Sequence, residues 1–369
     1  MRKVHFIGVL GVSMGWLANY MRENGWQVTG SDLNLSGHNI RNIPKGCDLV
    51  ITNSAITDDN IELRYALATG IKVMAREELL NQIMQSYNHR IAVAGSHGKS
   101  TTVAMISHIF KHANIPIVTH NGARMLDSDL GDSVTSGEIF LTEACEYKKG
   151  LLKLKPTVAV ITNMDTDHME CYRDFDDVKT TFEQFACSAK TVIRGELGEP
   201  GKYNESNAHL ATRVAKHFGI DDKTIAGALA TFPGIVGRAQ YLGKVNNCAI
   251  IADYAHHPTE LRAIIDATKA KYKRILIIFQ PHTYTRTIKL YDDFVRVLST
   301  VDCVLYKTFI ARGKPIKGGG AIDLARSLGK KYIATIPVLK RFIEHTTPNY
   351  DAVILAGAGD MANKLHPLA

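Results

Sequence analysis

Short apolar runs alternate with amphipathic stretches along the whole chain. The apolar run at residues 4–9 is followed by a stretch at 12–24 with helical spacing, and then by a second apolar run at 26–32. Runs of this length with helices between them predict parallel strands joined by helical crossovers. The run at 47–56 and the helical stretch after it continue the series, so residues 1–87 are expected to form one α/β domain.

A second series of strands and helices is expected at residues 88–232. Its first apolar run leads into the glycine-rich turn GSHGKSTT (95–102), and Val103, Ile106 and Phe110 then fall on one face of a helix. Its later elements are expected as strands at 138–144 and 157–165 and helices at about 204–218 and 221–231. The strands are apolar throughout, which is typical of parallel strands buried on both faces.

The third series occupies residues 233–369. Its strands are expected at 248–255, 274–281, 302–308 and 351–359. Each ends in a polar or glycine-rich stretch, where ligands bind in open α/β sheets. The chain is therefore predicted to be an α/β protein of three domains: a Rossmann-like domain, a central parallel sheet like that of P-loop ATPases, and a second Rossmann-like domain.

Composition narrows the class of protein. The chain has 369 residues, 45% of them hydrophobic and 22% charged, which is typical of a globular protein. Its six cysteines are scattered without a CxxC pair, which favours reduced thiols in the cytoplasm. The N-terminus does not resemble a signal peptide, and no apolar stretch approaches the roughly 18 residues of a membrane span, so no membrane insertion is expected.

The net charge of +8 favours an anionic partner. Nucleic acid and small polyanions such as nucleotides are both candidates. The sequence has no Lys/Arg run longer than two and no interleaving of basic and aromatic residues, so no nucleic-acid partner is expected.

The turn GSHGKSTT (95–102) lies between a strand and a helix, where backbone N–H groups and the helix dipole face a phosphate. The usual spacing is Gly, four residues, then Gly-Lys-Ser/Thr, but Val93 stands where the first glycine belongs and Gly95 follows it. Lys99 is expected to reach the β- and γ-phosphates, and Ser100 to ligate Mg²⁺. The alternative is an ordinary turn between a strand and a helix, in which the tripeptide Gly98-Lys99-Ser100 occurs by chance.

Two further polar side chains follow predicted strands. Glu143 and His168 are expected at the same sheet edge as the glycine loop, because parallel strands end together. They could hold Mg²⁺ there, although magnesium prefers oxygen ligands and a histidine would be unusual. The alternative is an acid at a strand end and a histidine that caps a helix.

The turn GVLGVSMG (8–15), with Asp32 after the next strand, partly matches a dinucleotide fingerprint. That fingerprint needs glycines at positions 8, 10 and 13, but Leu10 and Ser13 replace two of them. The turn therefore favours a general diphosphate site over an NAD site.

In the third domain, DYAHHPTE (253–260) and QPHTYTRT (280–287) place cationic groups directly after strands. Arg286 could clamp a carboxylate or a phosphate through two hydrogen bonds. The alternative is a surface arginine and solvated histidines.

Together these segments resemble the Mur ligase family, the ATP-dependent amide-forming ligases of peptidoglycan precursor synthesis. The matching segments are HFIGVLGVSMG (5–15), SDLN (31–34), NSAITDDN (53–60), REELL (76–80), GSHGKSTT (95–102), EACEY (143–147), NMDTDHMECY (163–172), GKYNESNAHLA (201–211), DYAHHPTE (253–260), FQPHTYTRT (279–287) and AGAGD (356–360). The chain is most similar to the branch that joins L-alanine to UDP-N-acetylmuramate.

The resemblance implies four groups of site residues. ATP is expected to contact Gly95, Ser96, His97, Gly98, Lys99, Ser100, Thr101, Asn204, Arg238 and Asp253. The UDP-substrate is expected to contact Gly8, Gly11, Val12, Ser13, Asp32, Ser54 and Ala55. The reacting carboxylate and amino acid are expected near Glu146, His256, His257, His282 and Arg286, and the metal at Ser100, Glu143 and His168. Lys99, His168 and Arg286 are the expected catalytic residues.

The reaction that the resemblance implies uses ATP and Mg²⁺. ATP phosphorylates the lactyl carboxylate of UDP-N-acetylmuramate, and the amine of L-alanine then displaces phosphate from the acyl phosphate. The protein would supply positioning and charge neutralisation rather than a nucleophile. A monomer or a homodimer is expected.

The sequence departs from the family pattern at several positions. Leu10 and Ser13 stand where glycines are usual, Gly237 precedes Arg238 in place of a second arginine, and only ELGEP (196–200) stands where several dozen residues are usual. Tyr203 replaces a histidine, and Lys314 a common acid. A shortened central domain is therefore expected, and two alternatives stay open: a ligase that recycles a cell-wall tripeptide, or a ligase-derived nucleotide-binding protein with weak turnover.

Overall fold

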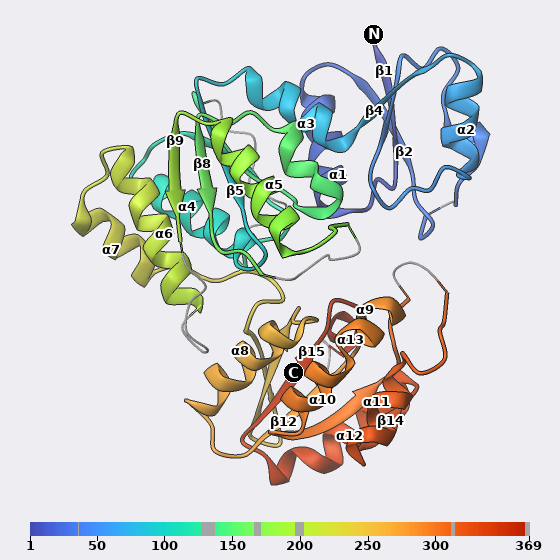
Figure 1. Ribbon diagram of the computed structural model, residues 1–369, viewed down its shortest axis with the longest axis vertical. Helices are drawn as coiled ribbons and strands as arrows, with labels where there is room; N and C mark the ends of the chain where they lie inside the picture. The colour runs from blue at the N-terminus through green and yellow to red at the C-terminus, as the bar shows by residue number, and fades with distance from the viewer. Residues whose placement is uncertain (36, 127–136, 166–170, 196–202, 311–313, 366–369) are drawn as a thin grey trace. The chain divides into compact units, whose positions relative to one another are not determined.

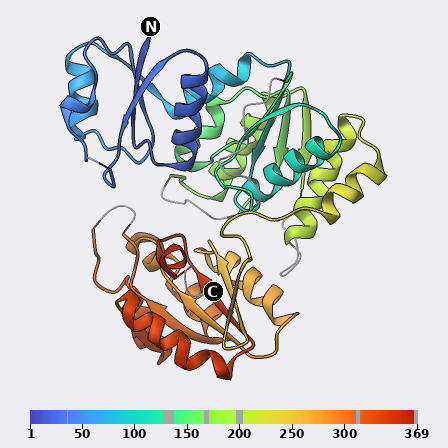
Figure 2. The same cartoon turned by 180° about the vertical axis from the view of Figure 1, so that it is seen from behind.

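The computed structural model describes residues 1–35, 37–126, 137–165, 171–195, 203–310 and 314–365. Three β-sheets with helices on their faces form two compact units, of which the first contains the N-terminal and central sheets and the second the C-terminal sheet (Figures 1 and 2). The predicted α/β architecture is confirmed. Within the described residues, no helix has both the length and the apolar character needed to cross a bilayer.

The N-terminal sheet has the strand order β2-β1-β3-β4, with every pair parallel. Its elements are β1 (Lys3–Ile7), α1 (Val12–Glu23), β2 (Gln27–Ser31), the 3-10 turn η1 (Ile40–Asn42), β3 (Leu49–Thr52), α2 (Ile61–Ala68), β4 (Lys72–Ala75) and α3 (Arg76–Gln85). Side chains of β1 alternate, so that Val4 and Phe6 pack with α1 and α3 while Ile7 packs with α2. Between β2 and β3 the described chain forms only η1, where a parallel crossover usually carries an α-helix.

A buried carboxylate holds this crossover in place. Glu62 of α2 is fully buried, and it accepts hydrogen bonds from the Ser31 hydroxyl, from the backbone N–H of Asn39 at 2.9 Å and from the side chain of Asn42 at 2.7 Å. Burial opposes its ionisation, but the His5 ring, 3.5 Å from the carboxylate, and these hydrogen bonds outweigh burial and hold the pKa of Glu62 at about 2. Glu62 thus ties the end of β2 and η1 to α2.

Glu62→Gln is expected to lower the free energy of unfolding at pH 7 by about 3 kcal/mol, because the folded protein favours the ionised carboxylate. The pKa in the folded state lies below its ordinary value of 4.5, so the stabilisation is present above pH 4.5 and is lost as the pH falls toward 2. Urea unfolding of both proteins across this range measures the difference. Glu23→Gln, at an exposed end of α1, is the control and should change stability by less than about 0.5 kcal/mol. A pH-independent difference would contradict this account.

The central sheet has the order β6-β7-β5-β8-β9 and is parallel throughout. Its elements are β5 (His89–Ala94), α4 (Lys99–His112), β6 (Ile117–His120), β7 (Ile139–Glu143), the 3-10 segment η2 (Tyr147–Lys153), β8 (Val158–Ile161), α5 (Phe175–Cys187), β9 (Thr191–Arg194), α6 (Tyr203–His217) and α7 (Asp222–Ala230). Ile91 and Val93 face α4, α6 and α7, whereas Ala92 and Ala94 belong to a core that α5 shares with α1 and α3. One continuous core therefore joins the first two sheets.

The C-terminal sheet has the order β10-β11-β15-β12-β13-β14, in which only the described pair β10–β11 is antiparallel. Its elements are β10 (Gln240–Val245), β11 (Cys248–Asp253), α8 (Pro258–Lys269), β12 (Ile275–Phe279), α9 (Tyr284–Lys289), α10 (Tyr291–Leu298), β13 (Asp302–Tyr306), α11 (Ala321–Leu328), β14 (Lys331–Ile333), α12 (Ile336–Thr346), the 3-10 turn η3 (Thr347–Asn349), β15 (Ala352–Ala356) and α13 (Met361–Leu365). Helices α8, α10 and α11 cover one face, and α12 and α13 cover the other.

Candidate active site

The glycine loop between β5 and α4 is shaped by its two glycines. Gly95 has φ +142°, and a Cβ there would overlap the hydroxyl of Thr162 at the end of β8. Gly98 has φ +82°, and a Cβ there would overlap the side-chain oxygen of Asn207 in α6. Only glycine satisfies both the backbone conformation and the space. Val93 is a buried residue of β5, so the short loop is a complete turn in its own right.

Polar groups at the end of β8 hold the loop. The backbone N–H of Ser96 donates to the carbonyl of Asn163 at 3.1 Å, and that of His97 donates to the Asn163 side chain at 3.0 Å. The His97 imidazole lies 2.9 Å from the Asp165 carboxylate, and the N–H of Asp165 donates to the Ser96 hydroxyl. The side chains of Ser96 and His97 therefore brace the loop, which pre-organises its backbone N–H groups.

Lys99 begins α4 and lies over the loop. Its ammonium donates to the carbonyls of Gly95 at 2.6 Å and Ser96 at 3.2 Å, and it forms an ion pair with Glu146 at 2.9 Å. Burial acts to lower the pKa of Lys99, but the Glu146 carboxylate outweighs it and raises the pKa, so the ammonium stays charged. The resemblance implied that Glu146 faces the substrate; in the structure its carboxylate is paired with Lys99.

The expected metal residues Ser100 and Glu143 both contact the loop that follows β6. The Asn121 side chain donates to the carbonyl of Ser100 at 3.2 Å, and the next N–H, that of Gly122, donates to the Glu143 carboxylate at 2.9 Å. A hydroxyl and a carboxylate are oxygen donors, which suit Mg²⁺. These two residues therefore fit the metal, whereas His168 lies outside the described residues.

Asn207 lies beside the glycine loop and was not among the expected site residues. It is buried in α6, next to Gly98, and its side-chain oxygen also accepts a hydrogen bond from Thr102 at 3.3 Å. The expected ATP residue Asn204 lies in the first turn of the same helix. The spacing of the two asparagines, three apart on a helix, was the available signal.

The residues that the resemblance assigns to the UDP-substrate lie after β1, β2 and β3: Gly8, Gly11, Val12, Ser13, Asp32, Ser54 and Ala55. The turns contact one another, since the N–H of Leu10 donates to the Asp32 carboxylate at 3.3 Å and the Asn53 side chain donates to the carbonyl of Ile7 at 3.4 Å. Leu10 is 55% exposed, so its side chain does not fill the turn. Gly11 is the N-cap of α1, whose first N–H groups suit an anion.

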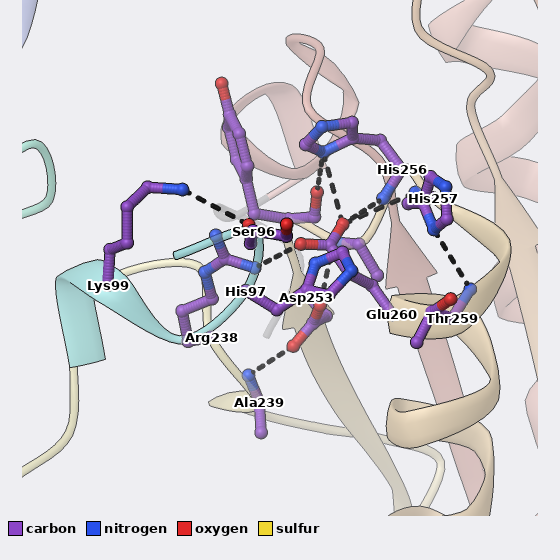
Figure 3. A network of polar contacts seen from close by, with 12 residues as sticks. Ser96, His97, Lys99, Arg238, Ala239, Asp253, His256, His257, Thr259 and Glu260 are labelled. Carbon is purple, nitrogen blue, oxygen red and sulfur yellow. Dashed lines mark hydrogen bonds and ion pairs between the residues drawn. The ribbon is translucent and has the colours of Figure 1, made fainter. Parts of the chain in front are cut away.

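In the second compact unit, Asp253 ends β11 and is buried. One carboxyl oxygen accepts from the N–H group of Ala239 at 2.7 Å (Figure 3). The other accepts from the N–H group of Ala255 at 2.8 Å. Burial raises the pKa of Asp253 to about 6, against the opposing effects of Arg238 and these two hydrogen bonds. Asp253 therefore changes its charge just below neutral pH.

The remaining C-terminal candidates gather beside Asp253. Glu260 accepts from the N–H groups of His256 at 3.0 Å and His257 at 3.3 Å, and it lies 3.4 Å from the Arg238 guanidinium. The rings of His256 and His282 are 5.5 Å apart, which brings the ends of β11 and β12 together. Burial raises the pKa of Tyr254, while the positive charges of Arg238 and Arg286 oppose that rise. All the candidates of this unit thus occupy one edge of its sheet.

The KM for ATP is expected to fall more steeply in the wild type than in Asp253→Asn as the pH rises from 5 to 7. The resemblance places Asp253 at a position that contacts the ribose of ATP, and a carboxylate accepts a hydrogen bond from a hydroxyl more strongly than a carboxyl group does. Asp253 ionises near pH 6. Steady-state kinetics give the KM for ATP of both proteins over this range. The titration of ATP itself affects both proteins equally and cancels in the comparison. Parallel pH profiles would show that Asp253 does not contact the nucleotide.

Comparison with known proteins identifies the family. Residues 3–88 match the description "Mur ligase family, catalytic domain", residues 93–193 match "Mur ligase middle domain" and residues 237–359 match "Mur ligase, glutamate ligase domain". A UDP-N-acetylmuramate–L-alanine ligase of Agathobacter rectalis is 33% identical over 97% of this chain and 95% of its own length. The chain belongs to the Mur ligase family. This Mur ligase is an ATP-dependent amide ligase of peptidoglycan precursor synthesis.

Further similar proteins agree with this membership. A UDP-N-acetylmuramate–L-alanine ligase of Clostridium tetani is 33% identical over 98% of this chain and 96% of its own length. The structure of a UDP-N-acetylmuramate–alanine ligase from Thermotoga maritima has a TM-score of 0.83 at 23% identity, covering 99% of this chain and 97% of that one. A murein peptide ligase from Psychrobacter arcticus has a TM-score of 0.72 at 22% identity, covering 100% and 98%. At these identities the two structures support the fold alone.

The Mur ligase chain is shorter than the A. rectalis relative. Its alignment with the A. rectalis ligase spans 440 positions, more than the 369 residues of the chain, so that relative has segments that this protein lacks. It stays a prediction that most of the missing residues belong after β9.

Proposed function

We propose that this Mur ligase joins L-alanine to the lactyl carboxylate of UDP-N-acetylmuramate, with ATP as the phosphoryl donor. The observation that supports this branch is full-length similarity, at 33% identity, to two relatives named for that reaction. The first compact unit is consistent with this proposal. The turn after β1, which suits an anion, and the glycine loop, which suits a phosphate, lie on neighbouring sheets that share one core.

In the proposed reaction the lactyl carboxylate attacks the γ-phosphorus of ATP, giving an acyl phosphate and ADP. The neutral amine of L-alanine then attacks the acyl carbon, phosphate leaves with the C–O bond electrons, and the amine loses a proton. Lys99 would neutralise charge on the transferring phosphoryl group. Ser100 and Glu143 would hold Mg²⁺, which when bound would offset the charge of the phosphates. Arg286, His256 and His282 would orient the carboxylate and the amino acid.

We assign a separate role to each of the three proposed domains. Residues 1–87 would bind the UDP-substrate, residues 88–232 would bind ATP and residues 233–369 would complete the ligase site. A monomer or a homodimer would suffice for this arrangement. Because the binding groups are spread over three domains, closure of the domains is expected during turnover.

Phosphate release tests the proposal. The full chain is assayed with UDP-N-acetylmuramate, ATP, Mg²⁺ and L-alanine, and each is omitted in turn. Release is expected only in the complete mixture, with UDP-N-acetylmuramoyl-L-alanine as the product by mass spectrometry. Activity with a cell-wall tripeptide in place of L-alanine would instead support the recycling ligase. Nucleotide binding without acceptor-dependent release would support the weakly active alternative.

A further inference from the structure

A chain of hydrogen bonds crosses from the N-terminal sheet to the central sheet. The Arg76 guanidinium lies 3.2 Å from the Ser13 hydroxyl, and that hydroxyl lies 2.8 Å from Nε2 of His120. Nδ1 of His120 lies 2.8 Å from the Thr142 hydroxyl, which donates to the carbonyl of Glu143 at 3.1 Å. The chain therefore begins beside the turn that follows β1 and ends at the candidate metal ligand.

One assignment of protons gives each polar group of this chain its hydrogen-bond partners. Thr142 uses its single proton on the Glu143 carbonyl, so it must accept from Nδ1–H of His120. Nε2 of His120 is then the acceptor, and the Ser13 hydroxyl donates to it while accepting from Arg76. The opposite tautomer would take away the bond to the Glu143 carbonyl. Burial lowers the pKa of His120 to about 3, which agrees with a neutral ring carrying one proton.

The middle of the chain is shielded from water. His120 is 2% exposed and Thr142 is fully buried, and the two are direct partners in the β6–β7 register. The Trp16 ring contacts the His120 ring edge-on at 5.1 Å, and the Arg76 guanidinium is anchored by Glu77 at 2.6 Å. A low-dielectric environment strengthens such bonds, and breaking one leaves a buried polar group without a partner.

We propose that Ser13, His120 and Thr142 are positioning residues that couple occupancy of the substrate turn to binding of the metal-nucleotide at Glu143. This inference rests on the proposed function, since it takes the turn after β1 as the UDP-substrate site. A ligand at the start of α1 orders Ser13, and the hydrogen bonds transmit that order to the strand end that carries Glu143. The second ligand then loses less conformational entropy on binding, which is positive cooperativity.

The test measures a coupling factor rather than activity alone. The dissociation constant of AMP-PNP with Mg²⁺ is measured by calorimetry with and without saturating UDP-N-acetylmuramate, using the full chain. We expect the substrate to tighten AMP-PNP binding by about fivefold or more in the wild type. In Ser13→Ala and Thr142→Val the same factor is expected to fall below about twofold, because either change interrupts the chain.

A matched variant separates positioning from packing. Thr142→Ser keeps the hydroxyl but removes a buried methyl group, so it should retain the coupling factor despite some loss of stability. Trp16 contacts His120, so its fluorescence can report on the chain. In a Trp26→Phe background Trp16 is the single tryptophan, and its emission should change when the substrate binds. Adding Thr142→Val to that background should make the change smaller. If Thr142→Val does not fold, Ser13→Ala provides the same comparison.

The outcomes are distinct. A coupling factor near one in the wild type, or an unchanged factor in Ser13→Ala and Thr142→Val, would overturn the coupling while leaving ligation by the wild type intact. Failure of UDP-N-acetylmuramate to bind would refute the proposed function, and the coupling proposal with it. Loss of coupling in Thr142→Ser equal to that in Thr142→Val would assign the effect to packing and reject the hydrogen-bond chain.

Discussion

Lys99→Ala is expected to lower kcat for ligation about a thousandfold, because a fixed ammonium on the transferring phosphoryl group contributes about 4 kcal/mol to the transition state. Lys99 is already held in the glycine loop by the carbonyls of Gly95 and Ser96 and by Glu146. Phosphate release under saturating substrates, corrected for the folded fraction, measures the effect.

Two controls accompany Lys99→Ala. Lys111→Ala, at the exposed C-terminal end of the same helix, should keep kcat within about twofold. Lys99→Arg keeps a positive charge next to Glu146 and should recover stability, yet it should remain slow because a guanidinium does not reproduce a compact ammonium. Residual activity of Lys99→Ala above a tenth of the wild-type rate would refute the catalytic role of Lys99.

Glu143→Gln is expected to lower kcat/KM about a hundredfold and to raise the Mg²⁺ concentration needed for half-maximal activity. The reason is that the variant loses the negative charge that would hold the metal, which is worth about 3 kcal/mol. The amide oxygen can still accept the hydrogen bond from Gly122, so the loop after β6 should stay in place. Magnesium titrations of the phosphate-release assay measure both quantities.

The matched control lies at the other end of the same strand. Glu138→Gln changes the same charge at an exposed residue just before β7 and should leave the Mg²⁺ dependence unaltered. If Glu143→Gln and the wild type require the same Mg²⁺ concentration, Glu143 is not a metal ligand. A changed thermal stability without a changed Mg²⁺ dependence would point to the same conclusion.

The apolar runs predicted the central strands of all three sheets well. β11, β12 and β15 are buried on both faces, so their sequences had to be apolar throughout, and that pattern is visible without a structure. The apolar runs did not predict β6, β10 and β14, for physical reasons. β6 and β14 are only four and three residues long, and β10 is an antiparallel edge strand with polar alternate positions. The predicted strand at 47–56 is shorter in the structure, because the chain turns directly after Thr52.

The candidate site, like the fold, could be predicted only in part from the sequence. The order of strand, glycine loop and helix predicted phosphate-binding roles for Lys99 and Ser100, since local spacing alone aims such groups at a phosphate. The partner of Lys99 was not predictable, because Glu146 reaches it only through the pairing of β5 with β7. Likewise, no motif marks His120 as the partner of Ser13, 107 residues away.

The sequence by itself determined the α/β class, the candidate phosphate loop and the resemblance to the Mur ligases, because these depend on periodicity and on short local motifs. Only the tertiary structure decided which side chains meet: Lys99 with Glu146, Glu62 with η1, and Ser13 with His120. A hydrogen bond requires its atoms to lie within a few tenths of an ångström of their ideal separation. That condition is met only when separate strands and helices have packed into one core.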